Sequence, residues 1–379
     1  MIQTGNLALY EGKPFGNIMM RSDYQEITGL GFEPGDSVNV LFNNGTALED
    51  IPFLCGCILP EGAICLNAYP GFDWIRIEKR FGRVWEPCRM TGAKTARVLL
   101  NEHGKYKVLQ DVFCTDFDIS AERYPSDEVF TNYRSLCGGR IRKGIVYRST
   151  ASFDPINNND AFFIRQRHLD RLLERDGIQF VLNMTCEQKM AEEIFSSGKY
   201  DGFYIHKLHK EGKVLSMQFP IDFLGSGFRN MLAAALRLMI ANTGPYLIQC
   251  RAGLDRTGFL CCILEALMGA DKREITDDYM RSFECLVRLN RDQDREKYEL
   301  LSICQVERIL EILTRGESVP RSFSTILSSG PEILRENDRD TLYSTDNLTA
   351  SAGKYLLECG MTPEEISELK RILETPYLR

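Results

Sequence analysis

The sequence contains little histidine, no surplus of basic residues and no long apolar run. Among its 379 residues are four histidines, and 53 acidic against 46 basic residues give a formal net charge of −7. A general nucleic-acid-binding protein carries a basic surplus, so this balance argues against nucleic acid as a partner. Hydrophobic residues make up 44% and charged residues 26% of the chain, which is typical of a globular protein and excludes a largely disordered one.

Targeting and metal-binding patterns are also missing. The longest apolar candidate, 231–241, is interrupted by Arg237 and is shorter than the roughly 18 residues of a membrane span. The first residues lack the basic and apolar regions of a signal peptide, so we expect a cytoplasmic protein. Its thirteen cysteines include no CxxC pair, and we expect them to be reduced. His206 and His209 stand in a short HKLH stretch without clustered carboxylates or thiols, and we expect no metal and no cofactor.

The length predicts two or three domains, and the first 118 residues read as a separate all-β domain. Short β-rich runs alternate there with turn sequences, which predicts a small barrel or sandwich whose ligand, if any, stays open. The predicted strands are 37–42, 51–57, 63–67, 74–78, 95–100 and 106–110, with hairpin turns at Asn44-Gly45 and at 102–104. The polar, acidic stretch 119–130 is predicted to be a linker.

From residue 131 to residue 379 the pattern changes to alternating helices and strands. This alternation predicts an α/β domain with a mainly parallel central sheet flanked by helices, and a helical C-terminal extension from about residue 297. The predicted strands are 178–184 and 246–249, and the predicted helices are 159–175, 228–242, 257–268, 298–313 and 347–358. A capping box with proline at the first helical position, Thr362-Pro363-Glu364-Glu365, begins a last helix.

One segment carries chemistry, the sequence YLIQCRAGLDRTG at 246–258. A buried strand precedes it, a helix follows it, and Gly253 permits a backbone conformation with positive φ. Such a loop forms a phosphate cradle, because its N–H groups point inward and the helix dipole favours an anion. The same groups favour thiolate over thiol at Cys250, which makes this cysteine the candidate nucleophile.

The other loop residues complete the cradle. The planar fork of Arg256 can hold two phosphoryl oxygens, and the hydroxyl of Thr257 can hydrogen-bond the Cys250 sulfur. Substrate binding is assigned to the rest of the loop: Arg251, Ala252, Gly253 and Leu254.

At these residues the sequence resembles the cysteine-based protein tyrosine phosphatase superfamily, whose signature is cysteine, five residues, arginine, then serine or threonine. More narrowly, CRAGLDRTG is similar to the loop of the bacterial tyrosine and lipid phosphatases. The segments 132–139 and 146–149 resemble the NFRDLGG and LYRS motifs of that subfamily, and 277–280 and 355–366 are also similar. Gln249, Leu254 and 183–185 depart from its pattern, where it has histidine, lysine and Asp-Leu-Arg.

The leaving group needs a proton, and two aspartates are candidates for the general acid. Asp255 lies in the loop, where the resembling subfamily has its acid. Asp222 lies 28 residues before Cys250, about where many tyrosine phosphatases carry a mobile loop with an aspartate. We favour Asp255 and keep Asp222 open.

The resemblance implies a phosphomonoester hydrolase that acts through a phosphocysteine intermediate, most simply a protein-tyrosine or dual-specificity phosphatase. The alternatives are a phosphoinositide or inositol-polyphosphate phosphatase, favoured by Arg251, and a non-catalytic phosphate or phosphoprotein binder. The expected partner is a phosphorylated protein or phosphoinositide, and the oligomeric state stays open. Cys186, at the end of the predicted strand 178–184, is a candidate thiol to form a protective disulfide with Cys250.

Overall fold

The computed structural model describes residues 2–12, 16–80, 82–86, 92–115, 120–155, 160–317 and 342–375. Within these ranges the chain divides into two compact units. The first unit contains the described residues up to 115 together with 294–305, and the second contains 120–293, 306–317 and 342–375.

The first unit is a closed barrel, which confirms the prediction of a small barrel or sandwich. Around the barrel the strands follow the order β1-β2-β6-β5-β4-β3-β7, and pairing of Leu7 with Ala96 closes it. All neighbouring strands are antiparallel except β4 and β5. The strands are β1 (Leu7–Gly12), β2 (Asn17–Met20), β3 (Ser37–Phe42), β4 (Ala47–Leu54), β5 (Ile64–Ala68), β6 (Ile75–Lys79) and β7 (Thr95–Glu102).

Alternation of apolar residues explains why these segments form a barrel. Val38, Val40 and Phe42 of β3 are buried in the barrel core, because side chains two apart in a strand point to the same face. The Asn44-Gly45 turn joins β3 to β4 as predicted: Gly45 has φ 87°, and its N–H donates to the carbonyl of Phe42 at 3.0 Å.

Two predictions for this unit are wrong. The segment 106–110 is not a strand, since α3 covers Lys107–Phe113, and the turn at 102–104 therefore joins β7 to a helix rather than closing a hairpin. The buried residues of α3 include Leu109 and Phe113, whose separation of four places them on one helix face. A second helix, α1 (Tyr24–Gly29), begins with a capping box at Asp23 and Glu26.

The second unit contains a five-stranded sheet in the order β11-β10-β12-β9-β8. Its first four strands are parallel to one another, and β8 is antiparallel to β9. The strands are β8 (Arg134–Ser135), β9 (Val146–Ser149), β10 (Phe180–Asn183), β11 (Val214–Ser216) and β12 (Tyr246–Gln249). Asn183 is the register partner of Gln249, so β10 and β12 end side by side.

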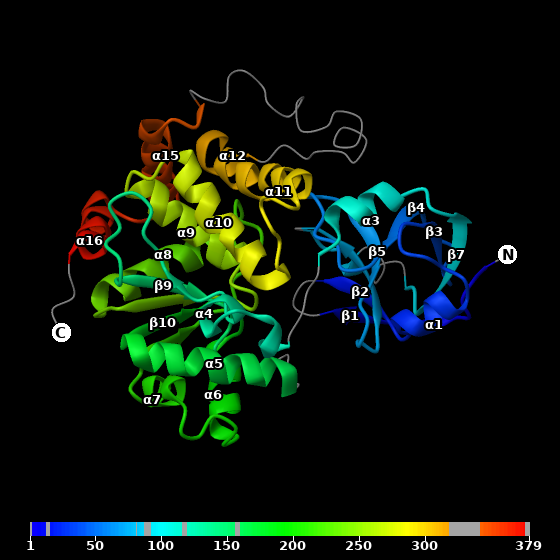
Figure 1. Cartoon of the computed structure of the whole chain (residues 1–379), viewed down its shortest axis with the longest axis horizontal. Helices are drawn as coiled ribbons and strands as arrows, with labels where there is room; N and C mark the ends of the chain where they lie inside the picture. The colour runs from blue at the N-terminus through cyan, green and yellow to red at the C-terminus, as the bar shows by residue number, and fades with distance from the viewer. Residues whose placement is uncertain are drawn as a thin grey trace. The chain divides into compact units, whose positions relative to one another are not determined.

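Helices cover both faces of this sheet (Figure 1). One face packs against α5 (Asp160–Asp176), α6 (Gln188–Ser196) and α7 (Tyr204–Lys210), which share a buried cluster with Val181 and Leu247. On the other face α8 (Ser226–Ala241) contacts β10, and α9 (Asp255–Leu267) contacts β12 and β9.

The remaining helices follow the chain toward its C-terminal part. They are α4 (Asp127–Phe130), α10 (Lys272–Val287), α11 (Arg295–Ser302), α12 (Arg308–Arg315), α15 (Thr345–Glu358) and α16 (Pro363–Glu374). A π-helical turn, Ile303–Glu307, joins α11 to α12 where one helix was predicted at 298–313, and α11 belongs to the first unit. The capping box at Thr362 is formed as predicted. Residues 119 and 159, which begin the predicted linker and the predicted helix 159–175, lie outside the described residues.

Candidate active site

The loop 250–254 joins the buried strand β12 to α9. All four residues of β12 are buried, and Cys250 at its end is only 3% exposed. Among the described residues no side chain caps the first turn of α9. Its first N–H groups and the positive end of its dipole are therefore directed at the loop, where they favour an anion.

Gly253 gives the loop its shape. It has φ +65°, and its N–H donates to the carbonyl of Cys250 at 3.2 Å, which closes a tight turn. A Cβ at this position would lie 2.2 Å from the carbonyl oxygen of Ser149 at the end of β9. The turn therefore requires glycine both for its conformation and for its contact with β9.

Two residues far away in the sequence donate hydrogen bonds to the backbone carbonyls of the loop. The amide Nδ2 of Asn132 donates to the carbonyls of Ala252 (3.2 Å) and Gly253 (3.3 Å), and Nη2 of Arg148 donates to the same Gly253 carbonyl at 2.8 Å. These bonds hold the carbonyls of Ala252 and Gly253 and leave them no part in binding an anion.

A buried ion network anchors Arg148 in turn. Arg148 is fully buried and pairs with Oδ2 of Asp278, and Arg134 pairs with Oδ1 of Asp278 at 2.7 Å. Burial raises the pKa of the Asp278 carboxyl, but the two guanidinium groups outweigh it and hold that pKa below its ordinary value. Ser282 accepts a hydrogen bond from each arginine, at 3.0 and 3.1 Å.

Glu265 of α9 is a second acid at this network and behaves in the opposite way. It is 1% exposed, and burial, followed by the charge of Asp278, raises its pKa well above its ordinary value. Its Oε2 has no hydrogen-bond partner among the described residues.

Arg256 folds back toward the end of the sheet. It is 4% exposed, and its Nη1 donates to the carbonyl of Met184 and, at 3.4 Å, to that of Phe219. The N–H of Met184 donates to the carbonyl of Gln249 at 2.9 Å. The guanidinium group thus lies at the end of β10, beside the strand that leads into Cys250.

The cation next to Cys250 is already paired. Nε of Arg251 lies 3.0 Å from Oδ2 of Asp154, a carboxylate that is only 3% exposed. This ion pair offsets the positive charge that made Arg251 a candidate for binding a second phosphate.

The two candidate acids occupy different positions. Asp255 is half-buried and is the first residue of α9. Asp222 is exposed, and its Oδ1 accepts the N–H of Gly225 at 3.1 Å just before α8. The bond from Arg256 to Phe219 brings the segment that carries Asp222 to the same part of the fold, so both aspartates remain candidates.

The hydrogen bonding of Thr257 and of Gln249, which lie on either side of Cys250 in the sequence, was not predicted from the sequence. Thr257 is buried, but its hydroxyl has no hydrogen-bond partner among the described residues, so the expected bond to the Cys250 sulfur is absent. Gln249 turns toward the backbone after β9, where its Oε1 accepts the N–H of Ser152 at 3.0 Å.

Cys186 lies beyond the end of β10 and is buried. Burial raises the pKa of its thiol to about 11, and Nδ2 of Asn183 donates to its sulfur at 3.4 Å. Because Asn183 is the register partner of Gln249, both cysteines follow neighbouring strands at the same edge of the sheet. A disulfide between Cys186 and Cys250 stays a prediction.

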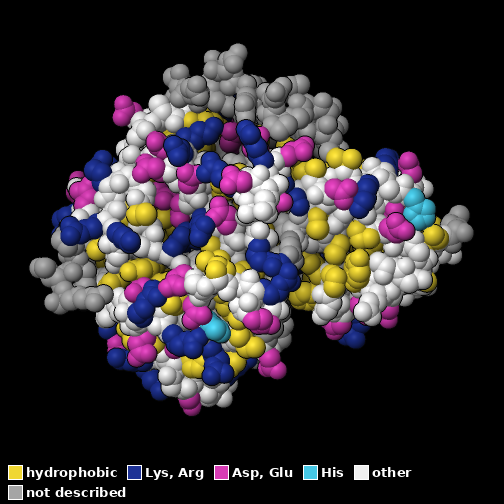
Figure 2. All heavy atoms as spheres, in the orientation of Figure 1, with side chains coloured by type: hydrophobic (Ala, Val, Ile, Leu, Met, Phe, Trp, Pro, Cys, Tyr) yellow, Lys and Arg dark blue, Asp and Glu magenta, His cyan; other side chains and the backbone are white. Residues whose placement is uncertain are grey.

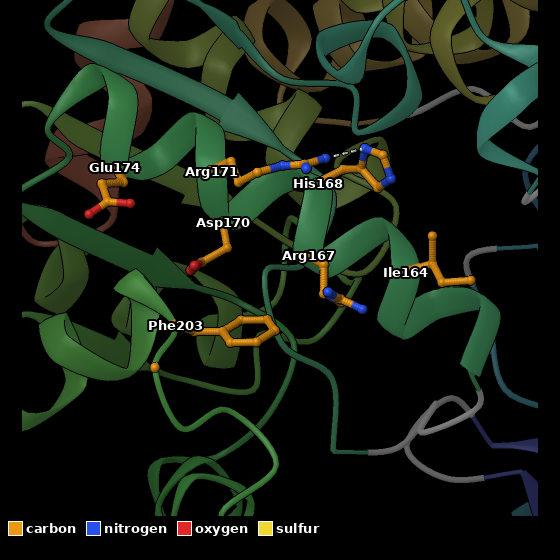
Figure 3. Close-up of a pocket in the computed structure, with 8 residues that line it drawn as sticks. Ile164, Arg167, His168, Asp170, Arg171, Glu174 and Phe203 are labelled. Atoms are coloured by element: carbon orange, nitrogen blue, oxygen red, sulfur yellow. Dashed lines mark hydrogen bonds between the residues drawn. The ribbon is translucent and has the colours of Figure 1, made fainter.

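A hollow elsewhere on the second unit contains none of the loop residues. It has a volume of about 480 Å³ and lies along α5, next to Gly202 and Phe203 (Figure 3). Several of its charged side chains form contacts within the fold: Asp170 accepts the N–H groups of Tyr204 and Ile205 at 2.8 and 2.9 Å, and Arg171 pairs with Asp127.

On the face drawn in Figure 2, basic and acidic side chains are interspersed and do not form a single charged patch.

The residues that support the loop could not be identified as such from the sequence. Asn132, Arg148 and Asp278 lie in segments that resemble family motifs, but nothing local in the sequence assigns them a contact. Their contacts with the loop and with one another join residues more than one hundred positions apart in the sequence. The resemblance of their segments to family motifs was therefore the one feature of the sequence that could have identified them.

Comparison with known proteins gives a match that includes the loop 250–254 but begins after Asn132 and Arg148. Residues 210–375 match a family model described as a tyrosine phosphatase family. The core catalytic domain of the PP-IP phosphatase SIW14 from S. cerevisiae is 20% identical, over 49% of this chain and 92% of that chain, with a TM-score of 0.27. TpbA from P. aeruginosa is 18% identical, over 40% of this chain and 85% of that chain, with a TM-score of 0.24. Comparison with curated proteins gives no match.

Two further features concern the described residues alone. None of their helices combines the length and the apolar character needed to cross a bilayer. Their His, Cys, Asp and Glu side chains form no group of three or more placed to hold a metal ion.

Proposed function

We propose, because residues 210–375 match the model of a tyrosine phosphatase family, that this chain hydrolyses phosphate monoesters through a phosphocysteine intermediate on Cys250. One observation carries the proposal. Cys250 sits at the buried end of β12, in a tight turn that opens onto the uncapped N-terminus of α9, with Arg256 folded back beside it.

The reaction has two steps. The Cys250 thiolate attacks phosphorus, the S–P bond forms and the ester P–O bond breaks, while a carboxylic acid protonates the leaving oxygen. Water then attacks phosphorus, the carboxylate takes its proton, and the S–P bond breaks to give inorganic phosphate and the thiolate. Asp255, or alternatively Asp222, is the acid in the first step and the base in the second.

The loop and Arg256 stabilise the transition state. Backbone N–H groups of 251–256, except that of Gly253, which is bonded to the Cys250 carbonyl, face the phosphoryl oxygens together with the dipole of α9, and negative charge accumulates on these oxygens. Carbonyls of Met184 and Phe219 hold Nη1 of Arg256, which orients the planar guanidinium group for bidentate contact with two of those oxygens.

Phosphotyrosine in a protein, with dual specificity included, is the substrate class that this site fits best. Leu254 brings no charge to the loop, and Arg251 is paired with Asp154, so the site has little spare positive charge for further phosphates. A phosphoinositide or inositol-polyphosphate phosphatase would need such charge. A non-catalytic phosphate binder would keep the cradle without turnover.

We infer the domain organisation and the cellular location of this phosphatase from the sequence. The barrel, residues 1–118, is proposed as a domain that supplies none of the reacting groups, with a linker at 119–130 and the phosphatase domain from 131. A reducing, cytoplasmic location suits a thiolate nucleophile.

Hydrolysis of p-nitrophenyl phosphate, a phosphotyrosine peptide and a phosphoinositide should be compared in wild type and in Cys250→Ser. The expected result is that turnover is highest on the peptide and is abolished by Cys250→Ser, whereas phosphate or sulfate binding is retained because the N–H cradle and Arg256 remain. Cys137→Ser, at an exposed cysteine outside the loop, is the matched control and should keep full activity. Arg256→Lys should lower kcat by about 10²-fold or more, because an ammonium group cannot make the bidentate contact.

Each other outcome rejects part of the proposal. Phosphate binding by wild type without turnover would identify a binder, and preference for the phosphoinositide would reassign the substrate. Substantial activity of Cys250→Ser would overturn the mechanism.

A further inference from the structure

Three cysteines of the barrel unit lie together, away from the candidate active site. Cys55 and Cys57 follow β4, and Cys114 ends α3. The side-chain amide of Gln110, one turn earlier in α3, exchanges two hydrogen bonds of 2.9 Å with the backbone of Cys55. The segment after β4 is thereby fastened to the end of α3.

Cys57 and Cys114 face each other directly across an antiparallel bridge. The N–H of Ile58 donates to the carbonyl of Phe113 at 3.1 Å, and the N–H of Thr115 donates to the carbonyl of Gly56 at 2.9 Å. Bonds that flank the bridge in this way make it a non-hydrogen-bonded pair, in which the two Cα atoms are about 4.5 Å apart and the side chains share one face. A disulfide needs a Cα separation of roughly 4.4–6.8 Å, so this pair can be linked without moving the backbone.

The two thiols are not equivalent. Cys114 is half-buried and Cys57 is 3% exposed. A hydrogen bond from the Cys57 thiol, assisted by the charge of Lys297, lowers the pKa of Cys114, while that bond raises the pKa of Cys57. Lys297 of α11 also donates to the carbonyl of Cys114 at 2.8 Å. Cys114 is therefore the thiolate that a solute can reach, and Cys57 is the protected thiol beside it.

We infer that Cys57 and Cys114 form a redox-modification site at which a hydroperoxide produces a reversible disulfide. The Cys114 thiolate attacks the terminal peroxide oxygen, the O–O bond breaks, and Cys114 becomes a sulfenic acid with release of water or an alcohol. The Cys57 thiol then attacks the sulfenic sulfur, the S–S bond forms, and the hydroxyl takes the Cys57 proton and leaves as water. The two thiols lose two electrons in total, and the peroxide is reduced by two.

Cys55 is the nearest competitor, and its position disfavours it. It is not opposite Cys114 in the bridge, and both its N–H and its carbonyl are held by Gln110. The pKa of the Cys55 thiol is raised to about 11 by burial and then by the charge of Cys114, and the pKa of the Cys57 thiol is raised as well, so position and not ionisation distinguishes the two cysteines.

Cleavage after glutamate separates the cysteines cleanly. The fragment 50–61 contains Cys55 and Cys57 as its only cysteines, and the fragment 103–122 contains Cys114 alone. The full chain is treated with hydrogen peroxide at neutral pH, its remaining thiols are alkylated, and it is digested without reductant. Mass spectrometry should find the two fragments linked, and dithiothreitol should separate them.

Three variants identify the partners. Cys114→Ser should abolish the link, and Cys55→Ser should retain it, as should the matched control Cys65→Ser at another buried barrel cysteine. Cys57→Ser should abolish it and leave a Cys114 sulfenic acid that dimedone traps. Absence of the link in wild type while the exposed Cys137 is oxidised would overturn the inference, as would a link that Cys57→Ser retains. The readout is a mass, so it stands or falls separately from phosphatase activity.

Discussion

Gly253 combines two constraints that no other residue type satisfies. Its φ of +65° is costly for any residue with a Cβ, and that Cβ would also lie 2.2 Å from the carbonyl oxygen of Ser149. The conformational part of this cost can be separated from the steric part, because Gly177 has the same φ of +65° with open space around it.

Gly253→Ala should therefore destabilise the second unit more than Gly177→Ala does. The left-handed conformation costs each variant about 1 kcal/mol, and overpacking against Ser149 adds about 1–3 kcal/mol at position 253 alone. Urea unfolding of the two variants measures the difference, and hydrolysis of p-nitrophenyl phosphate should fall only in Gly253→Ala. Equal losses of stability would show that the loop can move away from β9.

The choice between Asp255 and Asp222 is also a question about single residues. Replacement of the true general acid by asparagine should reduce kcat strongly for an alkyl phosphate, whose alkoxide needs a proton. The reduction should be small for p-nitrophenyl phosphate, because nitrophenolate leaves without one. We expect this leaving-group dependence in Asp255→Asn. If it occurs only in Asp222→Asn, the acid lies before α8 instead.

At the scale of elements, α9 brings a buried carboxyl to the network that holds the loop. In the folded protein, burial and then the charge of Asp278 raise the pKa of Glu265 well above its ordinary value, which favours the neutral carboxyl. In the unfolded chain it ionises above about pH 4.3. Unfolding then releases a proton, so this residue lowers the free energy of unfolding progressively as pH rises above that value.

Glu265→Gln removes the ionisation and should be more stable than wild type at pH 7 to 8. The difference in the free energy of unfolding should shrink as pH falls toward 4, where the glutamate is neutral in both states. Chemical denaturation across this range measures it, with Glu192→Gln on the exposed side of α6 as the control that should show no such trend. A difference independent of pH would contradict the assigned protonation.

The elements also show what sequence patterns can and cannot establish. The strands 37–42 and 246–249 were predicted with their observed ends, because continuous or alternating apolar residues between turn sequences define them locally. The segment 106–110 forms the start of a helix and not the predicted strand, because five residues are too few to distinguish strand alternation from the helical spacing of Leu109 and Phe113.

The candidate loop was visible in the sequence because its residues are contiguous. Its supports were not, because the contacts of Asn132, Arg148 and Asp278 depend on how distant segments fold together. The pairing of Arg251 with Asp154, which weakens the case for a second phosphate, likewise bridges 97 residues and could not be read from the loop alone.

At the scale of the whole molecule, the two units have separate hydrophobic cores. One core lies inside the barrel, and another lies between the sheet of the second unit and α5, α6 and α7. The polypeptide leaves the second unit at residue 293, contributes α11 to the first, and returns at 306. Units with their own cores unfold as separate cooperative transitions unless the interface between them is large.

Calorimetry should therefore resolve two transitions, of which an oxyanion stabilises only one. A ligand bound only to the native form adds RT ln(1 + [L]/Kd), about 2.7 kcal/mol at one hundred times Kd, which raises Tm by roughly 5–10 °C for a unit of this size. Vanadate should shift the transition of the second unit by this amount and leave the barrel transition unchanged. Arg256→Ala should remove most of the shift, whereas Arg167→Ala, at an exposed arginine on α5, should preserve it. An equal shift of both transitions would mean that the oxyanion is not held by the loop of the second unit, and a single transition would mean that the two cores unfold as one.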